Sequence, residues 1–282
     1  MTRREYTEQY SEQELAIKLS LEEAVVGYYN EYFVGLLDYV EGEIRKGSQK
    51  IQLPESIHTV MREHAGVVIE NAYRGQNLSN YDSSVLLSIL VNRANERIST
   101  ISPIVDQVTY NQINRALTRA VEALDVPYRV EQVLGRVLSY LREIWGRRAA
   151  NIATSETQVN LETLRYESNE YAEQQARWSL LLGDVESARQ HLQASTVFTY
   201  LGLADEIERV PQEQRMVVLG NRKKMWQSME DAKVRPSHAM ISGETIGKDE
   251  FFDVGGFPMR YPGDPFAPAQ ETANCRCVCV YL

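Results

Sequence analysis

The chain ends in Asn274-Cys-Arg-Cys-Val-Cys-Val-Tyr-Leu282, a segment that contains all three cysteines of the 282-residue sequence. The alternation of cysteine and valine up to Tyr281 predicts a β-strand over residues 275–282. A secreted protein held by disulfides would carry an even number of cysteines spread along its length. Three cysteines in one terminal segment therefore favour either a reducing compartment or a local metal site.

A carboxylate and an imidazole precede this segment, in Asp231-Ala-Lys-Val-Arg-Pro-Ser-His238. Zinc prefers thiolate and imidazole ligands, and a carboxylate can complete its four-coordinate shell. We therefore predict one zinc site formed by Asp231, His238, Cys275 and Cys277, with Cys279 as a spare thiol. The alternative is that the cysteines are small buried apolar residues and that His238 caps a turn.

If Cys275 and Cys277 bind the same metal ion, their spacing restricts the conformation of the backbone between them. Side chains two residues apart in a strand are separated by ~6.6–6.8 Å, whereas two sulfurs on one zinc ion lie within ~4.6 Å of each other. The chain is therefore expected to bend at Arg276, close to the end of the preceding loop at Asn274. A disulfide between these two cysteines would be strained. Four protein ligands leave no open coordination position, which favours a structural metal ion.

Charge and composition divide the chain into two parts. Residues 206–282 carry 11 acidic and 10 basic residues and six of the nine prolines, whereas residues 1–205 carry 28 acidic and 20 basic residues. The net charge of −9 argues against a general electrostatic nucleic-acid binder, and the acidic part is expected to bind proteins. The polar opening Met-Thr-Arg-Arg-Glu-Tyr and the lack of an apolar stretch of ~18–20 residues predict a protein made in the cytoplasm, without a membrane partner.

Apolar residues at steps of three and four predict long helices in the acidic part. The predicted helices cover residues 15–44, 54–75, a segment after Asp82, a segment between Pro103 and Pro127, and 130–145. Residues 147–210 indicate a more polar helix, interrupted at Gly183-Asp184, of the kind that crosses between domains or docks on a partner. The predicted fold class is mainly α. A multi-helix N-terminal domain covers 1–144, and a small, metal-stabilised α+β module covers 145–282, with a compact strand and loop core over about 216–282.

Common enzyme motifs are missing, since the sequence contains no GxxxxGK(S/T), GxGxxG, HExxH or GxSxG. His58 and His64 are about 600° apart around their predicted helix and do not share a face, so we expect structural or surface roles for both. Aromatic residues wrap around the first predicted helix instead of forming one stripe, which favours a partner interface there. They are Tyr28, Tyr29, Tyr32, Phe33 and Tyr39.

An ordered set of short motifs resembles the phage Mu F-like minor head protein family, also called the head-morphogenesis family. The set comprises Lys224-Met-Trp226, Asp231 to His238, Gly243, Phe251, Arg260-Tyr-Pro-Gly-Asp264 and Asn274-Cys-Arg-Cys277. Upstream, Arg148-Ala-Ala-Asn-Ile-Ala-Thr-Ser-Glu156-Thr is similar to a helical segment of the family, although Thr154-Ser155 replaces the usual Arg-Thr. The resemblance covers roughly residues 145–282 and is strongest after residue 224.

The resemblance implies a non-enzymatic minor capsid protein of a tailed bacteriophage or prophage. Such proteins lie in the virion near the portal vertex and act in head assembly and sometimes in DNA ejection. The implied partners are the portal protein, the major capsid protein or both, and contact with packaged DNA is a further implication. The family pattern falls on the same four predicted zinc ligands. Trp226, Arg235 and Asn274 are expected to support the site, Arg235 by pairing with Asp231.

A different class of function is a metal-dependent hydrolase or a toxin-like effector enzyme. In that case Asp231, His238 or Glu156 would act as acid or base groups. An open coordination position beside a pocket would favour catalysis, and a closed four-ligand site would favour the structural role.

Overall fold

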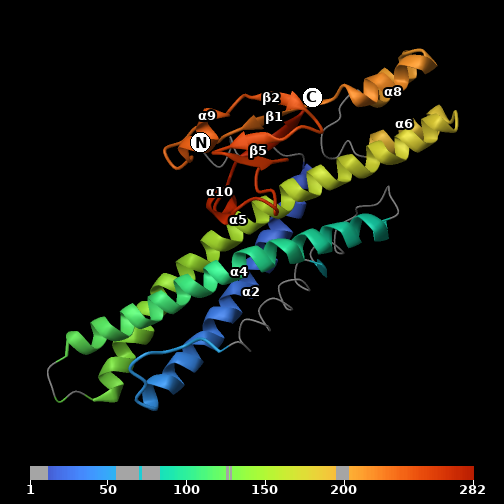
Figure 1. The fold of residues 1–282 in the computed structure, drawn as a ribbon. Coiled ribbons are helices and arrows are strands. Elements are labelled where there is room, and N and C mark those ends of the chain that lie inside the picture. The colour runs from blue at the N-terminus through green and yellow to red at the C-terminus, as the bar shows by residue number, and fades with distance from the viewer. Residues whose placement is uncertain (1–11, 55–69, 72–82, 125–126, 128, 195–202) are drawn as a thin grey trace.

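The structure is a computed structural model that describes residues 12–54, 70–71, 83–124, 127, 129–194 and 203–282. Within these ranges the chain is mainly helical, and a small strand-containing module lies at its C-terminus (Figure 1). The helices are α2 (Glu12–Arg45), α4 (Ser83–Glu122), α5 (Val130–Leu181), α6 (Val185–Ala194), α7 (Leu203–Arg209), α8 (Gln212–Gly220), α9 (Pro236–Met240) and α10 (Ala269–Thr272). The strands are β1 (Lys223–Gln227), β2 (Thr245–Gly247), β3 (Phe252–Val254), β4 (Phe257–Met259) and β5 (Val278–Tyr281).

Helix α2 follows the predicted apolar periodicity. Its buried residues at helical spacing include Ile17, Leu21, Val40 and Ile44, and the helix ends just before Gly47, whose φ of +83° suits the left-handed turn that terminates a helix. The prediction that its aromatic residues form a partner interface is wrong for most of them. Tyr28, Tyr29 and Phe33 are buried inside the chain, because α2 packs against α5 and Phe33 stacks on Trp145 with ring centroids 5.1 Å apart.

Helix α4 corrects the prediction of two separate helices. It runs unbroken through Pro103, which lacks the N–H that would bond to the carbonyl of Ser99. Ile101 and Val105 are buried on either side of the proline, and α4 packs along α5. The free energy gained by packing this apolar face against α5 therefore exceeds the free energy lost with the one backbone hydrogen bond.

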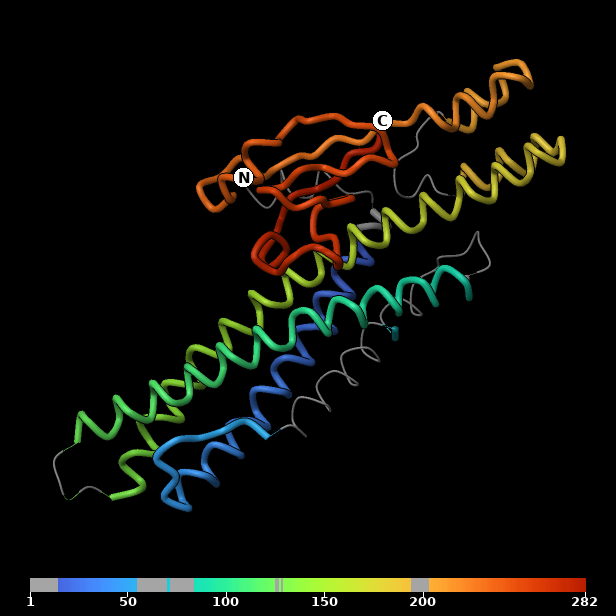
Figure 2. Tube along the Cα trace, in the orientation of Figure 1, coloured from blue at the N-terminus to red at the C-terminus, as the bar shows by residue number. Residues whose placement is uncertain are grey.

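Helix α5 is 52 residues long and belongs to both hydrophobic cores of the described chain. Its first part packs with α2 and α4, and its last turns pack with α6 and the C-terminal module (Figure 2). The proposed domain boundary between residues 144 and 145 falls within this helix. The predicted break at Gly183-Asp184 is confirmed, since Gly183 has a φ of +78° and separates α5 from α6.

The polar middle of α5 is buried, because the C-terminal module lies across it. The turn at Gly263 approaches so closely that a Cβ there would lie 2.8 Å from Val159 Cγ2. Lys248 reaches α5 from the module and forms ion pairs with Glu170 and Glu173 at 3.2 and 3.1 Å. The buried polar and charged residues of this stretch include Glu156, Thr157, Gln158, Asn160, Glu162, Thr163, Arg165, Glu167, Ser168, Asn169 and Glu173.

The module contains a three-stranded antiparallel sheet in the order β2-β1-β5 and a separate β3–β4 hairpin. Central strand β1 places Trp226 opposite Cys279, and both side chains are buried. The predicted strand or helix end at residues 215–219 is helical and lies in α8, whereas the predicted segment 224–227 is strand β1. The turns predicted at Gly243, at Gly255-Gly256 and at Pro262 to Pro265 all contain glycines with positive φ.

Some sequence predictions concern residues outside the described ranges. These are most of the helix predicted over 54–75, with His58 and His64, and the helix start at Asp82. None of the described helices combines the length and apolar character needed to cross a membrane.

Candidate metal centre

Three of the four predicted metal ligands come together in the module. The candidate ligand atoms of His238, Cys275 and Cys277 all lie within 4.8 Å of one another, and all three side chains are buried. Nδ1 of His238 lies 3.4 Å from Sγ of Cys277 and 3.7 Å from Sγ of Cys275. Nitrogen and sulfur ligands of a tetrahedral zinc ion are separated by about 3.5 Å, given their usual bond lengths. The donor types and their spacing therefore fit zinc.

His238 is held in place by the short helix α9 and by the sheet. Pro236 occupies the first turn of α9, and the backbone N–H groups of His238 and Ala239 donate to the carbonyl of Arg235. The buried ring of Trp226 meets the imidazole edge-on, with centroids 5.3 Å apart. The Trp226 indole N–H has no partner of good geometry among the described residues, but it lies close enough to Cys277 to oppose the rise in the pKa of that thiol that Cys275 and burial cause. Trp226 thus supports the site through packing and polarity.

The two cysteines lie in the irregular segment between the turn at Asn274 and strand β5, and not in the strand itself. Strand β5 begins at Val278, three residues later than predicted. Asn274 has a left-handed backbone with φ of +56°, and the N–H of Cys275 donates to the carbonyl of Thr272 at 3.2 Å. This turn brings both sulfurs to the same imidazole, which a regular strand would not do.

The bend is fixed to the middle of α5. The backbone N–H of Asn274 donates to Oγ of Ser155 at 2.7 Å. Arg97 of α4 forms two hydrogen bonds with Glu156, at 2.8 and 2.9 Å, and a third with Oγ of Thr272 at 2.6 Å. These three side chains are buried, so the helical part directly positions the loop that carries the cysteines.

Glu271 is a supporting residue that the sequence prediction missed. Its Oε2 lies 3.2 Å from Nε2 of His238 and accepts a hydrogen bond from Oγ of Ser237 at 2.9 Å. A carboxylate oxygen accepts the imidazole proton, so Nε2 carries that proton and the lone pair of Nδ1 faces the two sulfurs. A carboxylate behind a metal-binding histidine fixes the ring in this way in many zinc sites. The sequence around Glu271 contains no pattern that distinguishes it from other surface acids.

The thiols of Cys275 and Cys277 have pKa values shifted in opposite directions. Hydrogen bonding with Cys277 holds the pKa of Cys275 well below its usual value, despite burial. The same interaction with Cys275, together with burial, raises the pKa of Cys277. A bound cation would stabilise the thiolate form of both.

Asp231 lies apart from the three-residue group. Its carboxylate accepts a hydrogen bond from the Arg276 guanidinium at 2.7 Å and one from the Lys233 backbone N–H at 2.9 Å, and these lower its pKa to about 2. The expectation that Arg235 pairs with Asp231 is wrong. The guanidinium of Arg235 instead donates to the backbone carbonyls of Ala273 and Glu271, because it points beneath the cysteine loop.

Cys279 is also separate from the group. It lies in β5, and its backbone N–H donates to Oε2 of Glu162 at 2.9 Å. Burial raises the pKa of its thiol to about 12. These features are those of a buried core residue.

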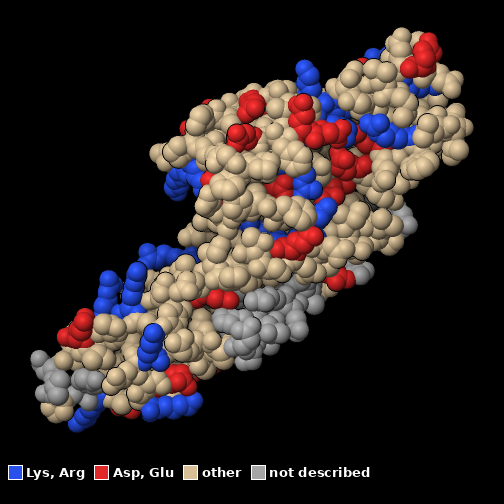
Figure 3. All heavy atoms as spheres, viewed as in Figure 1, with Lys and Arg blue, Asp and Glu red and all other residues tan. Residues whose placement is uncertain are grey.

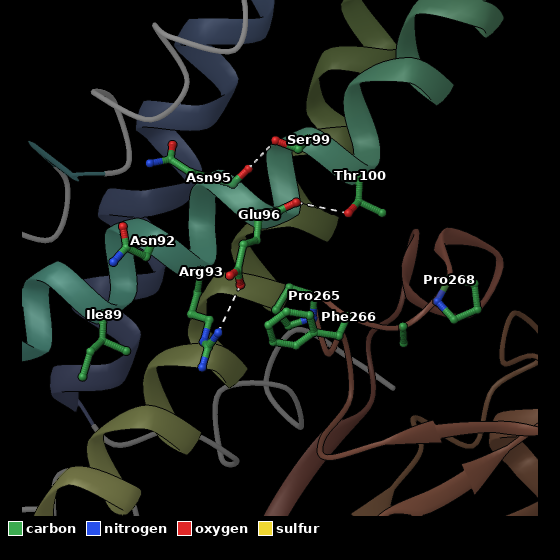
Figure 4. Close-up of a pocket in the computed structure, with 11 residues that line it drawn as sticks. Ile89, Asn92, Arg93, Asn95, Glu96, Ser99, Thr100, Pro265, Phe266 and Pro268 are labelled. Atoms are coloured by element: carbon green, nitrogen blue, oxygen red, sulfur yellow. Dashed lines mark hydrogen bonds and ion pairs between the residues drawn. The ribbon is translucent and has the colours of Figure 1, made fainter.

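In the part of the chain that the structure describes, the surface has two large hollows, and the three-residue group lines neither of them. The first, of about 930 Å³, lies between α4 and the loop 265–268, where Phe266 projects toward Arg93 and Glu96 (Figure 4). The second, of about 640 Å³, is bounded by α4, α5, Lys233, Ala273, Asn274 and Arg276, and we call it the arm groove. Asn274 and Arg276, the chain neighbours of Cys275, line this groove, whereas the buried side chains of the three-residue group do not.

Comparison with known proteins identifies the C-terminal third of the chain. The family described as Phage Mu protein F like protein matches residues 185–280, a range that contains the complete three-residue group, strands β1 to β4 and most of β5. The match begins at α6, so the segment 145–184, where the resemblance was also expected, lies outside it. No curated protein and no solved structure matches the chain.

Proposed function

We propose that this chain is a minor head protein of a tailed bacteriophage or prophage, with a Mu F-like module at residues 185–280. In this proposal the protein is not an enzyme. It binds the portal protein, the major capsid protein or both near the portal vertex, and it acts in head assembly and in DNA ejection. The family match supports the phage head role, and the long helices offer the extended surface that such an assembly protein needs.

The observation that carries the structural reading is the burial of His238, Cys275 and Cys277 beneath the sheet. We propose that they hold one zinc ion. Bound there, the ion would stabilise two thiolates and join α9 to the end of the loop that precedes β5. Small structural zinc sites contribute on the order of 10 kcal/mol to folding. The 36 residues between His238 and Cys275 contain the short strands β2, β3 and β4 and the short helix α10, so a cross-link at this point joins the two ends of a segment with little regular structure.

The fourth ligand is a separate question, because the carboxylate of Asp231 is engaged by Arg276. Asp231 can reach the zinc only after it exchanges that partner. We propose that its carboxylate keeps Arg276 in place beside the two cysteines.

Co-purification tests the function. The tagged chain is co-expressed with the portal protein of the phage or prophage that encodes it, and separately with the major capsid protein. We expect one of these proteins to co-elute with the chain in size-exclusion chromatography. Elution of the folded chain alone in both cases would refute the proposed role.

Elemental analysis of the reduced, purified protein tests the metal site independently. We expect about one zinc ion per chain. A folded protein without stoichiometric metal would refute the zinc proposal and would leave the head-assembly role to the co-purification result.

A further inference from the structure

We propose that the arm groove binds an acidic amphipathic helix of a partner protein. The groove lies where the helical part meets the metal-bearing module. It is lined by apolar residues of α4 and α5 and by polar and basic residues of the module. This inference deepens the proposed assembly role by assigning a docking surface, and it does not depend on bound metal.

The floor of the groove has the spacing that a docked helix requires. Ile101, Ile104, Val105 and Val108 recur on α4 at intervals of three and four residues, and Ile152 of α5 faces the same groove. Ile101 and Val105 are buried, whereas Ile104 and Val108 remain 42% and 40% exposed. The row extends over about 10 Å at 1.5 Å per residue, which matches about two turns of a partner helix. Grooves between two helices bind amphipathic helices through apolar side chains at this spacing.

The rim of the groove is basic. Arg148, Lys233 and Arg276 line it, and the carboxylate of Glu156 that also lines it is paired with Arg97. The Lys233 side chain is exposed and forms no ion pair within the described part of the chain. Figure 3 shows Lys and Arg atoms on both walls of the notch between the module and the helical part.

The two arginines of the rim, Arg148 and Arg276, are fixed in position. Arg148 donates to Thr109, Gln112 and the carbonyl of Val105, and its guanidinium lies over the Phe33 ring at 5.5 Å. Arg276 is held by Asp231. A positive rim on a chain with net charge −9 is a local feature that complements carboxylates on a partner.

The groove suits a protein helix better than nucleic acid. A phosphate backbone is bound by rows of Lys and Arg, and a strip of half-exposed Ile and Val contributes little to that contact. The same strip supplies the apolar centre of a helix-binding groove, surrounded by a polar rim.

Fluorescence anisotropy with the full chain tests the proposal. The probe is a labelled peptide of about 16 residues, with Leu at helical spacings of three and four and Glu at most other positions. The control peptide carries Lys at every Glu position. At physiological salt we expect the Glu peptide to bind at least tenfold more tightly than the Lys peptide. Equal binding of the two peptides would overturn the proposal.

Matched variants locate the binding site. We expect Lys233→Glu and Val108→Ser each to weaken binding of the Glu peptide at least fivefold. The controls are Arg142→Glu, an exposed arginine of α5 that does not line the groove, and Val85→Ser, a 43% exposed valine of α4. Unchanged affinity in both groove variants, or equal loss in the controls, would overturn the assignment. Circular dichroism confirms that each variant is folded.

A competition experiment with duplex DNA distinguishes an acidic protein helix from nucleic acid as the partner. We expect DNA not to displace the Glu peptide at the same salt concentration. Displacement by DNA, combined with no effect of Val108→Ser on DNA binding, would make the groove a nucleic-acid site and would overturn the helix proposal. Co-elution with the portal or capsid protein, measured separately, shows whether the assembly role stands when peptide binding fails.

Discussion

Nε2 of His238 lies 3.2 Å from Oε2 of Glu271, and both residues are buried. The carboxylate fixes the proton of the imidazole on the side away from the cysteines, so that Nδ1 is free to accept a metal ion. Glu271 therefore controls the orientation of the histidine without being one of the three grouped ligands.

Glu271→Ala is expected to weaken zinc binding about 10–100-fold, because the imidazole loses its proton acceptor and its fixed orientation. Competition with a chromophoric chelator measures the affinity. Glu244→Ala is the matched control, since Glu244 is exposed and its side chain lies away from the group. Equal affinities of the two variants would show that Glu271 does not support the site.

Cys275→Ser is expected to abolish stoichiometric zinc binding and to make residues ~216–282 sensitive to limited proteolysis, because a hydroxyl is a poor replacement for a zinc-bound thiolate. Cys279→Ala is expected to retain one zinc ion per chain, because Cys279 lies outside the ligand group. Zinc loss in the alanine variant and not in the serine variant would reverse the ligand assignment.

Arg97→Met is expected to lower the free energy of unfolding by about 3–5 kcal/mol, because it leaves the buried carboxylate of Glu156 without its partner. Replacing both residues, as Arg97→Met with Glu156→Leu, is expected to recover most of this loss. Urea unfolding measures the change. Arg93→Met provides the comparison, since the Arg93 side chain is 25% exposed and its loss is expected to cost about 1 kcal/mol. A double variant no more stable than the single one would contradict this reading.

The lowered pKa of the buried Lys18 makes the stability of the protein depend on pH. Burial lowers its pKa to about 8 from 10.5, although Glu22 opposes the shift. Between pH 8 and 10.5 the unfolded chain therefore binds more protons at this residue than the folded chain does, so its contribution to stability rises with pH. From pH 7.5 to 10, the free energy of unfolding of the protein relative to a Lys18→Met variant is expected to rise by about 2 kcal/mol. A flat or falling difference would contradict the sign.

Periodicity predicted the helices well where each helix buries a single apolar face. It placed α2 within a few residues of its ends, and it placed the break at Gly183. It failed at Pro103, because the cost of a proline in a helix is local, whereas the packing of α4 on α5 that offsets it is not visible in the sequence. It also could not show that the polar middle of α5 is buried, since that depends on where the module lies.

The candidate site was predictable in its donor atoms but not in its support. Thiolate and imidazole chemistry identified His238, Cys275 and Cys277, and bond-length geometry predicted that the two cysteines do not lie in a regular strand. The ion-pair partners could not be predicted from the sequence. Sequence proximity favoured Arg235 as the partner of Asp231, but the turn at Asn274 brings Arg276 to that carboxylate instead. Glu271 has no sequence signature, because its burial against His238 depends on tertiary contacts that the sequence does not show.

The continuity of α5 has a mechanical consequence. A helix of 52 residues is about 78 Å long, and here its two ends are anchored in different cores. The first part of α5 packs with α2 and α4. A force applied there is not absorbed by a break in the helix, because α5 is continuous from Val130 to Leu181. The force travels along the rod and reaches the cysteine loop through Ser155 and Glu156. The molecule is therefore built as a strut that rigidly connects its two hydrophobic cores.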